Sequence, residues 1–331
     1  MLETEVVVSP SPHIRAGYNA EGIMWVVVLA LVPASVAAVY YFGWPTLTII
    51  LASIAAAVLT EAVVVTIMKR PLTIYDGSAV VTGLLLALTL PPTVPVWIPV
   101  AGSIFAIIFG KQIYGGLGYN PFNPALIGRA FLLASWPTFM VNWVWPEGAL
   151  GWAKAEALAG ATMEAAGTAA DAVAGATALG LWRQGITGIP YLQLYFGNIA
   201  GSLGETSALA ILLGGLFLLI VKIIDWRIPF TYLGTVLLLA FLMGEDPLFH
   251  LLAGGLLFGA FFMATDYVTT PVTPWGRVFF GFGCGLLTML IRKFGGFPEG
   301  VCYSILLMNI TTPLLDRWTA PKRFGEVKAN G

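Results

Sequence analysis

Charged side chains are scarce in this sequence of 331 residues. Asp, Glu, Lys and Arg together make up 10% of it, whereas 58% of the residues are hydrophobic. A soluble domain contains about 25% charged residues, because water must wet its surface. The composition therefore predicts that lipid is the solvent for most of the chain. The net charge of −1 gives no basic field that would indicate nucleic acid as a partner.

Cysteine and histidine are almost absent. The two cysteines, Cys284 and Cys302, lie in apolar runs and form no CxxC pair. This argues against an iron–sulfur cluster or zinc site held by this chain alone, and against a disulfide framework. With His13 and His250 as its histidines, a bis-histidine haem is not expected. The N-terminus has no apolar run near its start, so we do not expect a cleaved signal peptide.

Long apolar runs are what the sequence does contain. A helix needs about 20 apolar residues to cross the hydrocarbon core. We predict an all-α polytopic membrane protein with about ten transmembrane helices, some of them short and broken by Gly or Pro. The predicted segments are 23–43, 45–68, 78–90, 96–110, 124–141, 207–224, 228–244, 250–264, 276–291 and 300–315. The shortest, 78–90, either crosses or enters a protein-lined site as a half-helix.

These segments divide the chain into two halves around an insertion. The predicted parts are an N-terminal segment (1–22), a first transmembrane half (23–141), an insertion (142–206), a second half (207–316) and a C-terminal tail (317–331). If all ten segments cross, eleven Lys and Arg residues, Lys111 among them, fall on one side and four on the other. The positive-inside rule then predicts both termini in the cytoplasm and the insertion outside.

The two halves contain similar stretches. Residues 83–88 and 100–105 align with 236–241 and 252–258, and a Gly-Arg pair ends each copy, at Arg129 and Arg277. Chance similarity between Leu- and Gly-rich helices is the alternative. Four elements separate the copies, which implies parallel repeats if all elements cross and inverted repeats if one is re-entrant.

Four stretches carry a resemblance to a known family. They are SAVVTGLLLALTLPP at 78–92, KQIYGGLGYNPFNPA at 111–125, FFMATDYVTTPVT at 261–273 and RKFGGFPEGVCYSILLMNITT at 292–312. In these stretches and in the order of its segments, the chain resembles the NqrB/RnfD family. It is most similar to the RnfD subunit of Rnf electron-transport complexes, and more distantly to NqrB of the sodium-pumping NADH:quinone oxidoreductase. The resemblance implies a fold like that of urea channels.

The resemblance also implies a covalent flavin in the insertion. In this family a Thr carries FMN through a phosphoester bond, with Asp six residues earlier, Ala directly before it and Leu two residues later. Thr177 fits this pattern with Asp171, Ala176 and Leu179, and Gly175 completes the attachment motif.

The sequence offers a weaker alternative acceptor. The tetrapeptide Ala-Gly-Ala-Thr occurs twice, ending at Thr162 and at Thr177, and Thr162 has Glu156 where the family has Asp. Thr177 departs from the family only in its flanks, where Ala174 replaces a usual Ser and Ala178 a frequent Pro. The aromatic residues that follow are predicted to be interfacial, with flavin stacking as the alternative: Trp182, Tyr191, Tyr195 and Phe196.

Polar residues near the membrane segments form the second group of candidates. A central site, such as one for a non-covalent riboflavin, is predicted from residues of the two repeat-related loops: Asn120, Asn123, Arg129, Thr265 and Asp266. Helix capping is the alternative for these residues. Glu61, inside an apolar segment, is either a station on an ion pathway or half of a structural pair with an Arg or a helix end.

The resemblance implies a subunit of a complex that transfers electrons between ferredoxin and NAD and pumps Na⁺ or H⁺. The chain has neither a strand-borne GxGxxG nor ferredoxin-like cysteines, so NAD and ferredoxin would bind other subunits. Expected partners are an extracytoplasmic FMN subunit, iron–sulfur membrane subunits, NAD- and ferredoxin-binding subunits, the lipid bilayer and a flavin transferase. The alternatives are an NqrB-like subunit of a quinone oxidoreductase, and a flavin-free channel or transporter.

Overall fold

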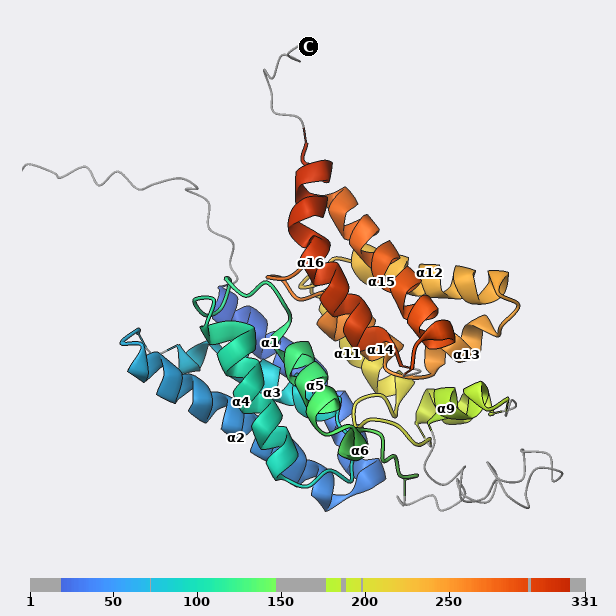
Figure 1. Ribbon diagram of the computed structural model, residues 1–331, viewed down its shortest axis with the longest axis horizontal. Coiled ribbons are helices and arrows are strands. Elements are labelled where there is room, and N and C mark those ends of the chain that lie inside the picture. Colours follow the sequence, from blue (N-terminus) through green and yellow to red (C-terminus); the bar gives the residue numbers. More distant parts are fainter. Residues whose placement is uncertain are drawn as a thin grey trace, which may run out of the picture.

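The described part of the chain is helical (Figure 1). The computed structural model describes residues 19–71, 73–146, 177–185, 189–197, 199–296 and 299–321, and no strand occurs among them. Asp171, Gly175 and Ala176 of the predicted attachment motif lie outside the described residues, as do Glu156 and Thr162.

The first half contains α1 (Ala20–Phe42), α2 (Trp44–Ile67), η1 (Ile74–Asp76), α3 (Ser78–Leu88), α4 (Trp97–Ile107), the π-helical turn η2 (Ile108–Gln112), α5 (Pro124–Ser135) and α6 (Pro137–Met140). The insertion contributes α9 (Ala178–Arg183) and α10 (Tyr191–Phe196). The second half contains α11 (Ala208–Ile220), α12 (Arg227–Leu242), α13 (Pro247–Leu252), α14 (Leu256–Phe258), the π-helical turn η4 (Gly259–Met263), α15 (Pro274–Phe294) and α16 (Val301–Thr319).

The ten predicted segments are confirmed as helical, although two of them are broken. Segment 124–141 divides into α5 and α6, and segment 250–264 into α13, α14 and η4. Among the described helices, α1, α2 and α15 are long and apolar enough to cross a membrane by themselves. Helix α3 has 11 residues, nine of them buried, and at 1.5 Å per residue it spans roughly half of the hydrocarbon core.

The two halves lie side by side and meet along α1 and α11 (Figure 1). The close approach depends on a glycine. A Cβ atom on Gly214 of α11 would lie 2.0 Å from the carbonyl oxygen of Ala30 in α1, so only a residue without a side chain fits there. The main apolar cluster of the described residues runs through both halves, which places any site between them in a fixed frame.

The helices of the two halves make similar contacts when each helix of the first half is matched with the one five elements later, not four. In the first half, α2 packs on α3 and α4, and α4 packs on α5; in the second, α12 packs on α13 and α15, and α15 packs on α16. An odd offset reverses the direction of crossing, so the halves are inverted repeats even when every element crosses. This packing gives the repeats a five-element register, which differs from the four-element alignment of the sequence.

A buried cation in each half supports this five-element register. Lys111, in the turn that follows α4, donates to the hydroxyl of Ser78 at the start of α3 at 2.5 Å. Arg292, near the end of α15, donates to the carbonyl oxygens of Ala253 and Gly254 just before α14, at 3.0 and 2.9 Å. Each cation forms hydrogen bonds with polar groups at the start of a short helix. Such groups need a partner within the protein, because the membrane interior offers no water to bind them.

Contacts between loops agree with ten crossings. On the predicted cytoplasmic side, Trp25 donates to the carbonyl of Tyr75. On the opposite side, Thr93 donates to the carbonyl of Asn142, and Tyr41 to that of Phe196. Lys111, which the charge count placed in a loop, is instead 2% exposed within η2. The excess of cationic residues on the predicted cytoplasmic side remains without it.

Candidate functional site

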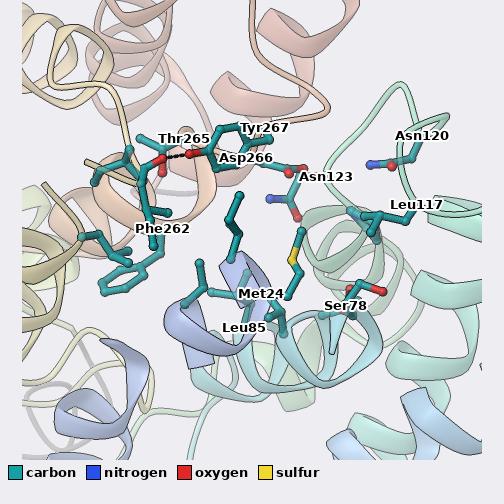
Figure 2. Close-up of a pocket in the computed structure, with 18 of the residues that line it drawn as sticks. Met24, Ser78, Leu85, Leu117, Asn120, Asn123, Phe262, Thr265, Asp266 and Tyr267 are labelled. Carbon is teal, nitrogen blue, oxygen red and sulfur yellow. Dashed lines mark hydrogen bonds between the residues drawn. The ribbon is translucent and has the colours of Figure 1, made fainter. Parts of the chain in front are cut away.

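A cavity of about 70 Å³ lies between the two halves, at the end where α3 and α5 begin. Four of the five residues predicted for a central site line it: Asn120, Asn123, Thr265 and Asp266 (Figure 2). They come from the turn before α5 and the turn after η4, which are far apart in the chain. The structure thus brings together what the sequence could only place in two separate loops.

Asn123 fixes one wall of the cavity. Its Oδ1 atom caps α5 by accepting from the backbone N–H groups of Ala125 and Leu126 at 3.0 and 3.4 Å, as expected for an N-cap residue. Its Nδ2 atom donates to the carbonyl of Met263 in the other half at 3.2 Å. The residue therefore caps a helix and also ties the two halves together beside the cavity.

Asn120 has an unused acceptor. Its Nδ2 atom donates to the carbonyl of Phe122 at 3.0 Å, but its Oδ1 atom has no hydrogen-bond partner among the described residues. The residue is 4% exposed. A buried acceptor without a donor costs about 1–3 kcal/mol, and a bound molecule with an N–H or O–H group would remove that cost.

Asp266 is the acidic group of the cavity. It accepts weakly from the backbone N–H of Val268 at 3.4 Å and from the hydroxyl of Thr269 at 3.3 Å. Burial raises the pKa of Asp266 to about 6, and these two hydrogen bonds offset only part of that effect. The carboxyl group can therefore take up or release a proton close to neutral pH.

The remaining wall is mostly apolar. Met24, Leu85 and Phe262 face the cavity from α1, α3 and η4 (Figure 2), and Ser78 and Lys111 add polar groups at one end. A neutral, largely apolar molecule that presents hydrogen-bond donors matches this lining best, because isolated charges are expensive in such surroundings.

Glu61 is fully buried and fully paired. Lys111 donates to both of its carboxylate oxygens at 2.7 and 2.9 Å, and Thr73 and Gln112 donate at 2.9 and 3.1 Å. This geometry matches the structural alternative, with Lys111 as partner in place of an Arg or a helix end. A role for Glu61 in an ion pathway stays a prediction.

Arg129 does not line the cavity. Its guanidinium donates to the carbonyl of Thr89 and to the carboxylate of Glu299, near the other end of α3. Glu205 lies beside this pair, and burial together with the charge of Glu299 raises its pKa to about 7. Sequence reasoning missed both glutamates. The polar turn between two apolar segments that contains Glu299 was the available signal.

Thr177 is the first described residue after the gap in the insertion. It is 7% exposed and is the N-cap of α9, where its Oγ1 atom accepts from the N–H of Gly180 at 3.2 Å. Helix α9 is attached to the second half, since Arg183 donates to the carbonyls of Gly295 and Gly296 and the ring of Trp182 lies edge-on to His250. The hydroxyl is therefore held against the membrane part of the protein.

Comparison with known proteins agrees with this arrangement. Residues 7–325 match the model of the NQR2, RnfD, RnfE family. The chain belongs to this family. It is 47% identical to the RnfD-type subunit of the Na⁺-translocating ferredoxin:NAD⁺ oxidoreductase complex of Acetobacterium woodii, over 99% of this chain and 98% of that one.

Other relatives from this family are nearly as similar. The corresponding subunit of the proton-translocating ferredoxin:NAD⁺ oxidoreductase complex of Clostridium ljungdahlii is 46% identical, with 96% of each chain covered. That of the ion-translocating oxidoreductase complex of Escherichia coli is 40% identical over 97% of this chain and 99% of that one. These relatives are subunits of ion-translocating oxidoreductase complexes, and their names differ in the ion.

Proposed function

We propose that the chain is the membrane subunit of an Rnf-type complex that carries covalent FMN on Thr177. In this proposal the complex transfers electrons between ferredoxin and NAD and couples that transfer to translocation of Na⁺ or H⁺. Full-length similarity to the corresponding subunits of such complexes is the observation that carries the proposal. NAD and ferredoxin would bind partner subunits, because this chain has no strand-borne GxGxxG and its two cysteines, both buried, do not suit an iron–sulfur cluster.

The surroundings of Thr177 fit a phosphoester. The ester oxygen could accept from the N–H of Gly180, as the hydroxyl does now. A flavin attached there would stay beside the second half, because α9 is held by Arg183 and by packing of Leu179 against Gly254. When bound, FMN supplies one- and two-electron transfer. The residues of this chain anchor it and keep it from diffusing away.

A non-covalent riboflavin in the central cavity is a further part of the proposal. The lining is apolar with a few polar groups, as is typical of cofactor sites, and the free Oδ1 acceptor of Asn120 matches a donor on the flavin. The cavity of about 70 Å³ would have to widen to admit the flavin ring system, because ligand pockets usually measure about 300–1,000 Å³. The cavity lies at the predicted cytoplasmic end of the membrane part and Thr177 at the opposite end. Two flavins so arranged would divide the path of electrons across the bilayer.

The covalent flavin is tested by in-gel fluorescence of the denatured chain and by peptide mass mapping, after co-expression with a flavin transferase. We expect a fluorescent band and an FMN adduct on the peptide that contains Thr177. Thr177→Ala should abolish both, whereas Thr162→Ala should leave both intact. The opposite pattern would move the site to Thr162, and a chain without any adduct would favour the flavin-free channel.

The non-covalent flavin is tested by acid extraction followed by chromatography of the released flavin. Asn120→Leu, which removes the free acceptor, should lower the amount of extractable riboflavin at least tenfold and leave the covalent band unchanged. Asn142→Leu alters an exposed asparagine and should change neither. Equal extractable flavin in both variants would contradict a riboflavin in this cavity.

A further inference from the structure

A second cavity, of about 590 Å³, opens beside the central one. It is formed by the end of α11, the start of α12, the turn after η4 and the start of α15. Four residues line both cavities: Ile223, Ile224, Thr265 and Tyr267. The hydroxyl of Tyr267 donates to the carbonyl of Ile223 within this shared wall. The second cavity, called here the basic groove, is therefore separate from the central one but adjacent to it.

Positive charge is in excess at the basic groove. Lys222 and Arg277 line it together with Asp225. Asp225 accepts from both Arg277 and Arg227, so one carboxylate is shared by two guanidinium groups. Lys222 is exposed, and its ammonium group makes no hydrogen bond or ion pair among the described residues. The groove thus holds a free cation and a second, partly compensated one.

Lys222 occupies a backbone position that favours glycine. Its φ angle is 60°, and the backbone N–H groups of Lys222 and Ile223 donate to the carbonyls of Leu219 and Leu218, each at 3.0 Å. This pattern is the Schellman motif that ends many helices, usually with glycine in the left-handed position. A lysine there costs backbone energy that glycine would not, so glycine can replace it without strain.

The rim of the basic groove is aromatic and apolar. Trp226 and Phe230 are each 58% exposed, and the guanidinium of Arg227 lies 5.5 Å from the ring centre of Trp226. Exposed Trp residues next to cationic residues mark the interface between headgroups and acyl chains. The apolar faces of α11 and α12 continue from this rim into the hydrocarbon region, since Leu216, Ile220 and Leu238 are exposed.

We propose that the basic groove binds an anionic phospholipid. The phosphate would interact with Lys222 and Arg277, and the acyl chains would lie along α11 and α12. Basic pockets between transmembrane helices are suited to such headgroups, because the attraction adds to the burial of the chains. A cation is unsuited to this groove, since its charge excess is positive. This inference rests on the membrane character of the fold and not on the proposed flavins.

Native mass spectrometry of the delipidated full-length chain tests the proposal. The probes are phosphatidylglycerol, zwitterionic phosphatidylethanolamine with the same acyl chains, and glycerol 3-phosphate. We expect preferential binding of phosphatidylglycerol. Lys222→Gly removes the ammonium while suiting the left-handed backbone, so it should weaken phosphatidylglycerol binding about fivefold without impairing folding. Lys222→Arg should retain binding.

Lys69 supplies the matched control. It ends α2 in the same motif, with a φ angle of 52°, and it is exposed but lines neither cavity. Lys69→Gly should leave binding unchanged. Equal loss in the two glycine variants, or unchanged binding in Lys222→Gly, would overturn the proposal. Equal binding of both phospholipids would exclude charge recognition, and binding of glycerol 3-phosphate as tight as that of the lipid would identify a free-phosphate site instead.

Discussion

Asp266 shows how one carboxyl group makes the fold sensitive to pH. Its pKa is about 6 in the folded chain and 3.8 without burial. Between these values the folded state keeps a proton that the unfolded state loses, so stability falls as pH rises from about 4 to 6. We expect thermal unfolding in detergent to show this loss, which is about 3 kcal/mol for the difference between these two pKa values. Asp266→Asn should remove it, and an unchanged pH profile in that variant would refute the assignment.

Two Lys–Glu ion pairs, one in each half, differ in burial. Lys111 and Glu61 are 2% and 0% exposed, whereas the side chains of Lys293 and Glu245 are 36% and 14% exposed. Removing one partner of a buried pair leaves an unpaired charge and costs about 3–5 kcal/mol, while an exposed pair contributes about 0–1 kcal/mol.

Substitution of each lysine tests this difference in burial. We expect Lys111→Met to lower the melting temperature of the purified chain strongly and Lys293→Met to lower it little. Adding Glu61→Gln to Lys111→Met should restore part of the loss, because the charge left without a partner is then gone. Similar losses in the two single variants would show that the pairs are equally solvated.

At the scale of elements, glycine positions set how closely helices approach. Gly214 of α11 faces the backbone of α1, whereas a Cβ atom on Gly234 of α12 would meet nothing within 4 Å. Gly214→Leu should therefore separate the two halves and reduce the yield of folded, monodisperse chain. Gly234→Leu should have little effect or stabilise α12, because leucine has a higher helix propensity than glycine. Size-exclusion profiles after extraction compare the two, and equal profiles would contradict the close contact of α1 with α11.

The sequence predicted where the helices lie in the chain better than it predicted how the helices contact one another. Apolar length located each segment, since the hydrocarbon core imposes the same demand on all of them. The register of the repeat differs between the sequence alignment and the packing, because Leu- and Gly-rich runs match one another at several offsets. Ser78, the partner of Lys111, and Gly254, a partner of Arg292, support the five-element offset. They are separated from these cations by 33 and 38 residues, and no local pattern signals such contacts.

In the candidate site, too, the sequence predicted residues better than it predicted their contacts. Asn120, Asn123, Thr265 and Asp266 were predicted because polar residues between apolar segments are conspicuous. Arg129 shares that feature, but its long side chain forms an ion pair with Glu299, which is 170 residues away in the sequence. Side-chain direction depends on how α5 packs against α16, which the sequence does not state. The sequence predicted a site from the residues of the two repeat-related loops, but it did not predict which of them line the cavity.

At the scale of the whole molecule, the order of crossings determines which sites share a compartment. If α3 crosses, Thr93 and Asn142 lie on the same side, in agreement with the hydrogen bond between them, and Lys69 and Tyr119 lie on the other. We expect a membrane-impermeant maleimide added to intact cells to label Thr93→Cys and Asn142→Cys. Lys69→Cys and Tyr119→Cys should react only in inverted vesicles. Cys284 and Cys302 are buried and should stay unlabelled. Labelling of Lys69→Cys from outside would reverse the orientation, and labelling of Thr93→Cys only from inside would make α3 re-entrant.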